Sequence, residues 1–145
     1  MLRLFKRVLL LAPALLAVAA CGSNNSVTTP TGPSLPTILT ETFAGTLNRN
    51  SAFTFPFSVT DSGTVSVFLI TSADAGNPDN NAIPVGVSLG TWNGSACAVV
   101  IANDNVAPGS SITGQATGAG NLCVRVYDVG LVPSSANVEL LIDHP

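Results

Sequence analysis

The sequence has little positive charge. Only five of its 145 residues are Lys or Arg, and three of these, Arg3, Lys6 and Arg7, stand at the start of the chain. The other two, Arg49 and Arg125, face eight acidic side chains, so the chain beyond residue 7 has a formal charge of about −6. Nucleic-acid binding depends on clustered basic side chains, and this composition therefore excludes a nucleic-acid partner.

The chain also lacks the residues of common catalytic and zinc sites. Its only histidine, His144, precedes the terminal Pro145, where we expect a frayed and solvated side chain. A Ser-His-Asp or Cys-His arrangement needs a firmly held histidine, and a zinc site needs about four suitable ligands. The acidic residues are mostly dispersed singly along the chain. We therefore predict that the protein is not an enzyme and needs no cofactor.

A run long enough to cross a membrane is missing as well. The apolar run Val8 to Ala20 has thirteen residues and is interrupted by Pro13, whereas a membrane-spanning helix needs about 20 residues. Basic residues precede the run and small residues end it, which is the order found in an export signal. The start of the chain is thus predicted to direct export.

The signal closes with Val18-Ala19-Ala20-Cys21, which resembles the lipobox of bacterial lipoproteins. The resemblance implies that residues 1–20 are removed and that Cys21 carries acyl chains, and more than one chain gives stable anchoring. Gly22 follows the cysteine where aspartate would favour retention in the inner membrane. We therefore expect a membrane partner through the N-terminal lipid, in the bacterial outer membrane or elsewhere in the cell envelope.

Residues 21–39 are rich in Ser, Asn, Thr and Pro, with prolines at 30, 33 and 36. Such a stretch has too little apolar surface to offset the entropy lost on ordering, and its prolines favour extended conformations. It is predicted to be a disordered tether between the lipid and a folded domain at 40–145.

Alternation of apolar and polar residues with a period of two recurs from residue 40 onward, with turn residues between the segments. This pattern predicts an all-β domain, an antiparallel β-sandwich of about eight strands that is either jelly-roll or immunoglobulin-like. Pro56 cannot donate to a strand ladder, so its strand is expected at a sheet edge. The apolar stripes are expected to be used up by the core. The predicted strands are 42–47, 52–59, 64–70, 83–92, 96–102, 110–116, 121–129 and 137–143, with a long loop at 71–82.

Two cysteines remain once Cys21 is assigned to lipid, and in an exported protein they favour a disulfide. A bond between Cys97 and Cys123 would close a loop of about 26 residues and contribute about 3 kcal/mol. The two cysteines fall on different sides of their strands' apolar pattern. The bond is therefore expected near a strand end, where alternation is relaxed.

Two features suggest a ligand. Asp74, Asn77, Asp79 and Asn81 gather oxygen ligands of the kind calcium prefers, although the spacing lacks a full calcium-loop pattern and an ordinary turn is the alternative. Trp92 stands before Asn93-Gly94 at a strand end, where the ring would form either an exposed stacking platform for sugar or peptide or part of the core.

The strand sequences resemble the bacterial pre-peptidase C-terminal domain, a small β-sandwich found on exported proteins. The similar segments are 43–47, 55–59, 63–67, 122–128 and 138–142. This resemblance implies the fold and a non-catalytic role, and it assigns no functional residue. The sequence thus predicts a lipid-anchored, non-catalytic envelope protein that acts as a binding or structural module for an unknown protein or glycan. The alternatives are an accessory to an envelope hydrolase and a calcium-dependent domain that binds glycan or protein.

Overall fold

The computed structural model describes residues 36–145, and all regular structure in this part of the chain is β-strand. No helix within it is long and apolar enough to cross a membrane. The predicted signal and all but the last few residues of the predicted tether lie outside the described residues. The strands are β1 (Leu39–Asn48), β2 (Ala52–Val59), β3 (Gly63–Asp74), β4 (Val85–Trp92), β5 (Cys97–Val106), β6 (Ser111–Ala116), β7 (Gly120–Tyr127) and β8 (Ser135–His144).

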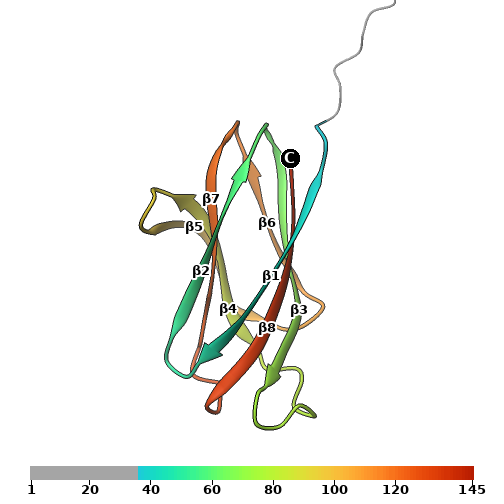
Figure 1. Cartoon of the computed structure of the whole chain (residues 1–145), viewed down its shortest axis with the longest axis vertical. Helices are drawn as coiled ribbons and strands as arrows, with labels where there is room; N and C mark the ends of the chain where they lie inside the picture. Colours follow the sequence, from blue (N-terminus) through green and yellow to red (C-terminus); the bar gives the residue numbers. More distant parts are fainter. Residues whose placement is uncertain (1–35) are drawn as a thin grey trace, which may run out of the picture. The chain divides into compact units, whose positions relative to one another are not determined.

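The strands form two four-stranded sheets that pack face to face (Figure 1). The first sheet has the order β1-β8-β3-β6 and the second has the order β2-β7-β4-β5. All strand pairs are antiparallel. Apart from the β4–β5 pair, successive strands alternate between the two sheets, and this strand order is that of a jelly roll. The predicted all-β sandwich is confirmed, and the strand order decides between its two proposed topologies.

The core follows from the alternation seen in the sequence. In β3, for example, Val65, Val67 and Leu69 are fully buried between the sheets, while their neighbours are partly or fully exposed. Burying one such side chain contributes about 1.5–3 kcal/mol. Phe53 and Phe55 of β2 pack at one margin of this core, where Phe55 contacts Phe43 of β1 with ring centroids 4.9 Å apart. The aromatic rings of β2 thus join the two sheets.

The expected position of the proline strand is confirmed. Strand β2 lies at the edge of its sheet and pairs only with β7, where Pro56 stands opposite Cys123. An edge strand tolerates a residue without an N–H because one side of the strand needs no ladder.

Several strands are longer than the sequence predicted. Strand β3 continues through a bulge after Leu69 to Asp74, because residues 71–74 pair with residues 136–139 of β8. The predicted loop at 71–82 is therefore wrong in its first part, and the connection to β4 begins only after Asp74. Strand β1 starts at Leu39, and β5 runs on to Val106.

The prediction for His144 is wrong. Its side chain is only 1% exposed, and its Nε2 lies 3.1 Å from Oε1 of Glu41. Strand β8 extends to His144, which pairs with Leu39, and the carbonyl of Pro145 accepts a hydrogen bond from the amide of Thr60. The chain end is held by these contacts and so does not fray.

The apolar residues of β5 also depart from expectation. Val99, Val100 and Ile101 are 48%, 72% and 36% exposed, so this stripe is not used up by the core. Strand β5 is the edge of its sheet and pairs only with β4. The domain therefore carries an uncovered apolar edge.

Asp128 ties two loops together at one end of the sandwich. Its Oδ1 accepts hydrogen bonds from the amides of residues 130–132 at 2.7, 3.0 and 3.1 Å. Its Oδ2 accepts one from the amide of Asn50, which has a left-handed φ of 56°, at 2.8 Å. Burial alone would raise the pKa of Asp128, but these four amides favour the carboxylate and lower the pKa below its ordinary value.

Replacing Asp128 with alanine is expected to lower the free energy of unfolding by about 1–2 kcal/mol, a modest value because water reaches the carboxylate. Since the folded-state pKa lies below the unfolded one, this contribution is present at neutral pH and is lost as the pH falls through about 4 and below. Denaturant unfolding between pH 7 and pH 3 should show a smaller acid dependence for D128A than for the wild type. Asp61→Ala, which removes only bonds to the adjacent Ser62, is the matched control. Equal acid dependence in both variants would contradict this account.

Candidate functional site

A hollow of about 570 Å³ lies on the second sheet, at the end where β4 turns toward β5. Trp92, the last residue of β4, is half-buried at this hollow. Strand β2 contributes Pro56, Phe57 and Ser58. All residues that line the hollow are uncharged: Pro56, Phe57, Ser58, Trp92, Asn93, Gly94 and Asn121.

Two side-chain amides line the hollow beside the indole ring. Asn121 of β7 uses its Oδ1 to accept a hydrogen bond from the hydroxyl of Ser58, at 2.8 Å. Asn93 uses its Oδ1 to accept bonds from the amides of Ser95 and Ala96, at 3.0 and 2.8 Å. With both oxygens engaged, each amide keeps its NH₂ group as a donor, and within residues 36–145 neither group donates to the protein.

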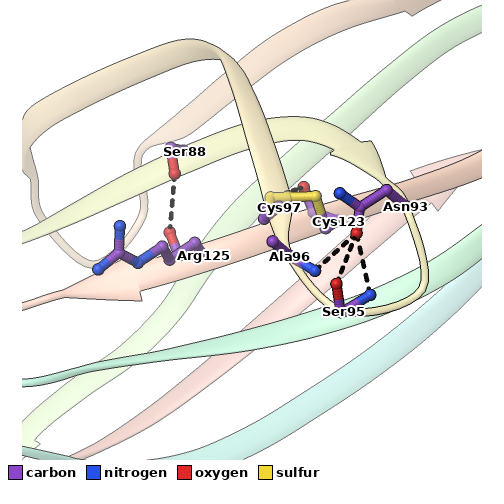
Figure 2. Close-up of a disulfide and its surroundings, with 7 residues drawn as sticks. All are labelled: Ser88, Asn93, Ser95, Ala96, Cys97, Cys123 and Arg125. Atoms are coloured by element: carbon purple, nitrogen blue, oxygen red, sulfur yellow. Dashed lines mark hydrogen bonds between the residues drawn. A yellow bond between two sulfur atoms is a disulfide. The ribbon is translucent and has the colours of Figure 1, made fainter.

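The turn that carries Asn93 is firmly held (Figure 2). Besides the side-chain bonds, the amide of Asn93 donates to the carbonyl of Ala96 at 3.2 Å, and Gly94 adopts a left-handed φ of 96° that favours glycine. The disulfide between Cys97 and Cys123 follows the turn directly, as the sequence predicted. Trp92 and Asn93 are therefore positioned by a rigid segment.

The disulfide reaches across a strand. Cys97 begins β5 and Cys123 lies within β7, and β4 lies between these two strands in the sheet. The sequence predicted that the disulfide lies near a strand end. This is correct for Cys97, which begins β5, but not for Cys123, which lies within β7. The Cα atoms are only 5.8 Å apart because β5 folds closely over Gly90 of β4. A Cβ atom at Gly90 would lie 2.7 Å from the carbonyl carbon of Ala98, so only glycine permits this approach.

A second polar group lies on the same sheet and was not singled out from the sequence. The hydroxyl of Tyr127 donates to Asp104 of β5, and the guanidinium of Arg125 lies 5.8 Å from the centre of the tyrosine ring. Burial and the hydrogen bond to Asp104 raise the pKa of Tyr127 to about 12. Tyr127 therefore keeps its proton to a higher pH than an ordinary tyrosine, and its hydrogen bond to Asp104 braces β5 against β7. A Cβ atom at position 86 would collide with the tyrosine ring, so the glycine at this position is the signal in the sequence that could have pointed to this group.

Among the described residues, no hydrogen bond joins the side chains of the four residues proposed for calcium. Asp74 ends β3, and its Oδ1 accepts a hydrogen bond from the amide of Gly76 at 2.9 Å, which is an ordinary turn. Backbone bonds close the rest of the loop, from Asn77 to Asp74 and from Asn80 to Asn77. Calcium binding by Asp74, Asn77, Asp79 and Asn81 stays a prediction.

The described residues contain no grouping of three or more His, Cys, Asp or Glu side chains suited to a metal ion. His144, the chain's one histidine, is paired with Glu41. Its imidazole ring packs against the ring of Phe57, and the two ring centroids are 5.1 Å apart. Cys21, the predicted lipidation site, lies outside the described residues. The hollow at Trp92 combines an aromatic ring with two side-chain amides and no charged residue, and it is the candidate site.

No protein-family model matches the chain, and no curated protein matches it. Among solved structures, a protein of Bacillus endospore appendages, described as a family of disulfide-linked pili, is 15% identical and covers 77% of this chain and 90% of its own, with a TM-score of 0.37. A Burkholderia pseudomallei antigen and type I fimbria protein is 13% identical and covers 74% of this chain and 97% of its own, with a TM-score of 0.28. Similarity this distant does not indicate what this chain binds.

Proposed function

We propose that this protein is a lipid-anchored, non-catalytic module of the bacterial envelope that binds an uncharged glycan in the hollow at Trp92. The observation that carries the proposal is the hollow itself, where one indole ring lies beside two amides with free NH₂ groups.

The chemistry of the hollow fits a sugar ring. One face of a pyranose is lined with C–H groups that pack on an aromatic ring, and its hydroxyls accept and donate hydrogen bonds at the rim. Trp92 supplies the ring, and the amides of Asn93 and Asn121 supply donors. Because no charged side chain lines the hollow, it offers phosphate or carboxylate groups no opposite charge. A neutral glycan is the ligand class that uses all of these groups.

The N-terminal sequence supports a role in the envelope. The lipobox-like segment ending at Cys21 supports lipid anchoring, and the Ser, Thr and Pro residues that follow support an extended tether. A tethered domain samples a volume around its anchor, which raises the effective concentration of the site near immobile envelope polymers. Weak binding of each glycan unit is then sufficient for retention.

Replacing Trp92 with alanine is expected to weaken glycan binding by about 30-fold, because truncation of a central aromatic anchor typically costs about 2 kcal/mol. The measurement is co-sedimentation of the purified protein with insoluble polymers of neutral sugars and of N-acetylated amino sugars. Trp92→Phe keeps a stacking surface and should retain part of the affinity.

The matched control is Leu131→Ala, which removes an exposed apolar side chain outside the hollow. This variant should bind as the wild type does. Wild-type protein that binds none of the polymers, or a W92A variant that binds them all equally well, would contradict the glycan proposal and favour a structural spacer.

A further inference from the structure

We propose that β5 is a self-association edge, through which two copies of this chain join their second sheets into one continuous sheet. This inference goes beyond glycan binding and does not depend on it. It rests on the exposure, sequence and position of residues 98–102, here called the β5 strip.

The β5 strip has the features that sheet edges normally avoid. Strand β5 is a sheet edge of ten residues, and its strip contains no charge and no proline. Val100, the residue left unpaired by a bulge in the β4–β5 ladder, is 72% exposed. Edges that must remain single are usually short, charged, bulged or interrupted by proline, and of these devices the strip has only the bulge at Val100. An exposed apolar edge of this length is instead suited to accept another strand.

The strip continues into an apolar hollow. A cavity of about 120 Å³ lies beside β5, lined on the β5 side by Val100 and Ile101 and on β6 by Gly114. Leu89 and Leu122 also line it. A strand added to β5 would therefore gain apolar contact at this opening as well as backbone hydrogen bonds. Burial of both surfaces favours association.

The sequence of the strip identifies a second copy as the occupant. The strip reads Ala98-Val99-Val100-Ile101-Ala102, which is nearly palindromic in side-chain size. In an antiparallel pair of two β5 strands centred on Val100, alanine faces alanine, valine faces isoleucine, and Val100 faces Val100 of the other copy. Matched cross-strand pairs of this kind stabilise a sheet, and a two-fold axis requires a surface that complements itself.

Charge agrees with the same register. Asp104, which lies just beyond the strip, would stand opposite the uncharged Ala96 of the other copy, so no like charges meet along the paired edge. The chain's segment 22–35 is a poor alternative occupant, because only Val27 and Leu35 in it are apolar. The strand is also already ordered, since the disulfide at Cys97 holds its start, and little further entropy is lost on pairing.

The experiment uses the full chain expressed in a bacterial envelope, with single cysteines introduced for oxidative cross-linking. Val100→Cys is expected to give a disulfide-linked dimer at a level at least tenfold above Leu131→Cys, an exposed control site in the loop before β8. Differently tagged Ala98→Cys and Ala102→Cys chains should cross-link to each other when coexpressed, and each should do so poorly with itself. This pattern is specific to an antiparallel pair centred on Val100.

Charge repulsion provides an independent measurement that leaves the core untouched. Val100→Lys should convert the detergent-solubilised protein from dimer to monomer in sedimentation velocity, whereas Leu131→Lys should not. The proposal is overturned if V100C dimerises no more than L131C, or if A98C links efficiently to itself, which indicates parallel strands. A cross-link from V100C to a different protein in place of a second copy would likewise overturn it.

Discussion

Alanine at Gly90 is expected to cause a large loss of stability in the domain's second sheet. The added Cβ would lie 2.7 Å from the carbonyl carbon of Ala98 and 2.9 Å from Cα of Val99. Both neighbours are backbone atoms, and the disulfide at Cys97 prevents β5 from moving away. Overpacking of this kind costs about 3 kcal/mol. Because β5 must lift for the alanine to fit, formation of the disulfide should also be impaired.

Gly118→Ala is the matched control, because no atom lies within 4 Å of a Cβ at that position and its φ is not left-handed. Its free energy of unfolding should stay within about 0.5 kcal/mol of the wild type. Denaturant unfolding, together with thiol titration of the purified proteins, measures both effects. A G90A variant with wild-type stability and no free thiol would show that β5 does not depend on close approach to Gly90.

Serine at Cys21 is expected to abolish lipid attachment. The thiol is the group that the resemblance to a lipobox assigns to acylation, and a hydroxyl does not replace it in that reaction. The variant should fail to incorporate an alkyne fatty acid and should accumulate as a precursor that still carries residues 1–20. Metabolic labelling followed by gel electrophoresis of the envelope fraction measures both outcomes.

Ser23→Ala is the control for this experiment, since it changes a neighbouring side chain and leaves the thiol in place. It should label and mature as the wild type does. Equal labelling of the C21S and wild-type chains would contradict lipidation at Cys21. Retention of the protein in the envelope would then need a different explanation.

Much of the fold could be predicted because local chemistry decides it. Period-two alternation in β2 and β3 indicates that one face of each strand is buried, and Pro56 indicates a strand at the edge of a sheet because it lacks an N–H. The pairing of Cys97 with Cys123 was predicted because no other cysteine was left once Cys21 was assigned to lipid. These signals need no knowledge of which strands are neighbours.

The parts that sequence analysis missed depend on strand neighbours. Residues 71–74 look like loop residues, yet they form strand because β8 lies beside them. His144 is buried because Glu41 and Phe57 come from strands far away in the chain. The stripe in β5 was expected in the core because its composition is apolar, and only the strand order places it at an open edge.

The candidate site likewise combines features that the local sequence predicts with features that depend on which strands are neighbours. The sequence identified Trp92 and the turn after it, but left open whether the ring is core or platform. The structure places the ring half-buried at the hollow, beside Asn121 and Ser58 from two other strands. Those partners follow Trp92 by 29 residues and precede it by 34 residues, and no local pattern links them. The sequence therefore offered a sugar platform at Trp92 as one of two alternatives, whereas the residues that complete the hollow could not be found from sequence alone.

The chain contains a single tryptophan, so the intrinsic fluorescence of Trp92 reports directly on the proposed site. Soluble oligosaccharide fragments of a polymer that retains the protein should be titrated into it while the emission is recorded. The proposal predicts a saturable change in emission that is absent with charged phosphate-containing fragments and that weakens when Asn121 is replaced with alanine. The central claim would be contradicted if a polymer binds the protein but saturating concentrations of its soluble fragments leave the emission of Trp92 unchanged.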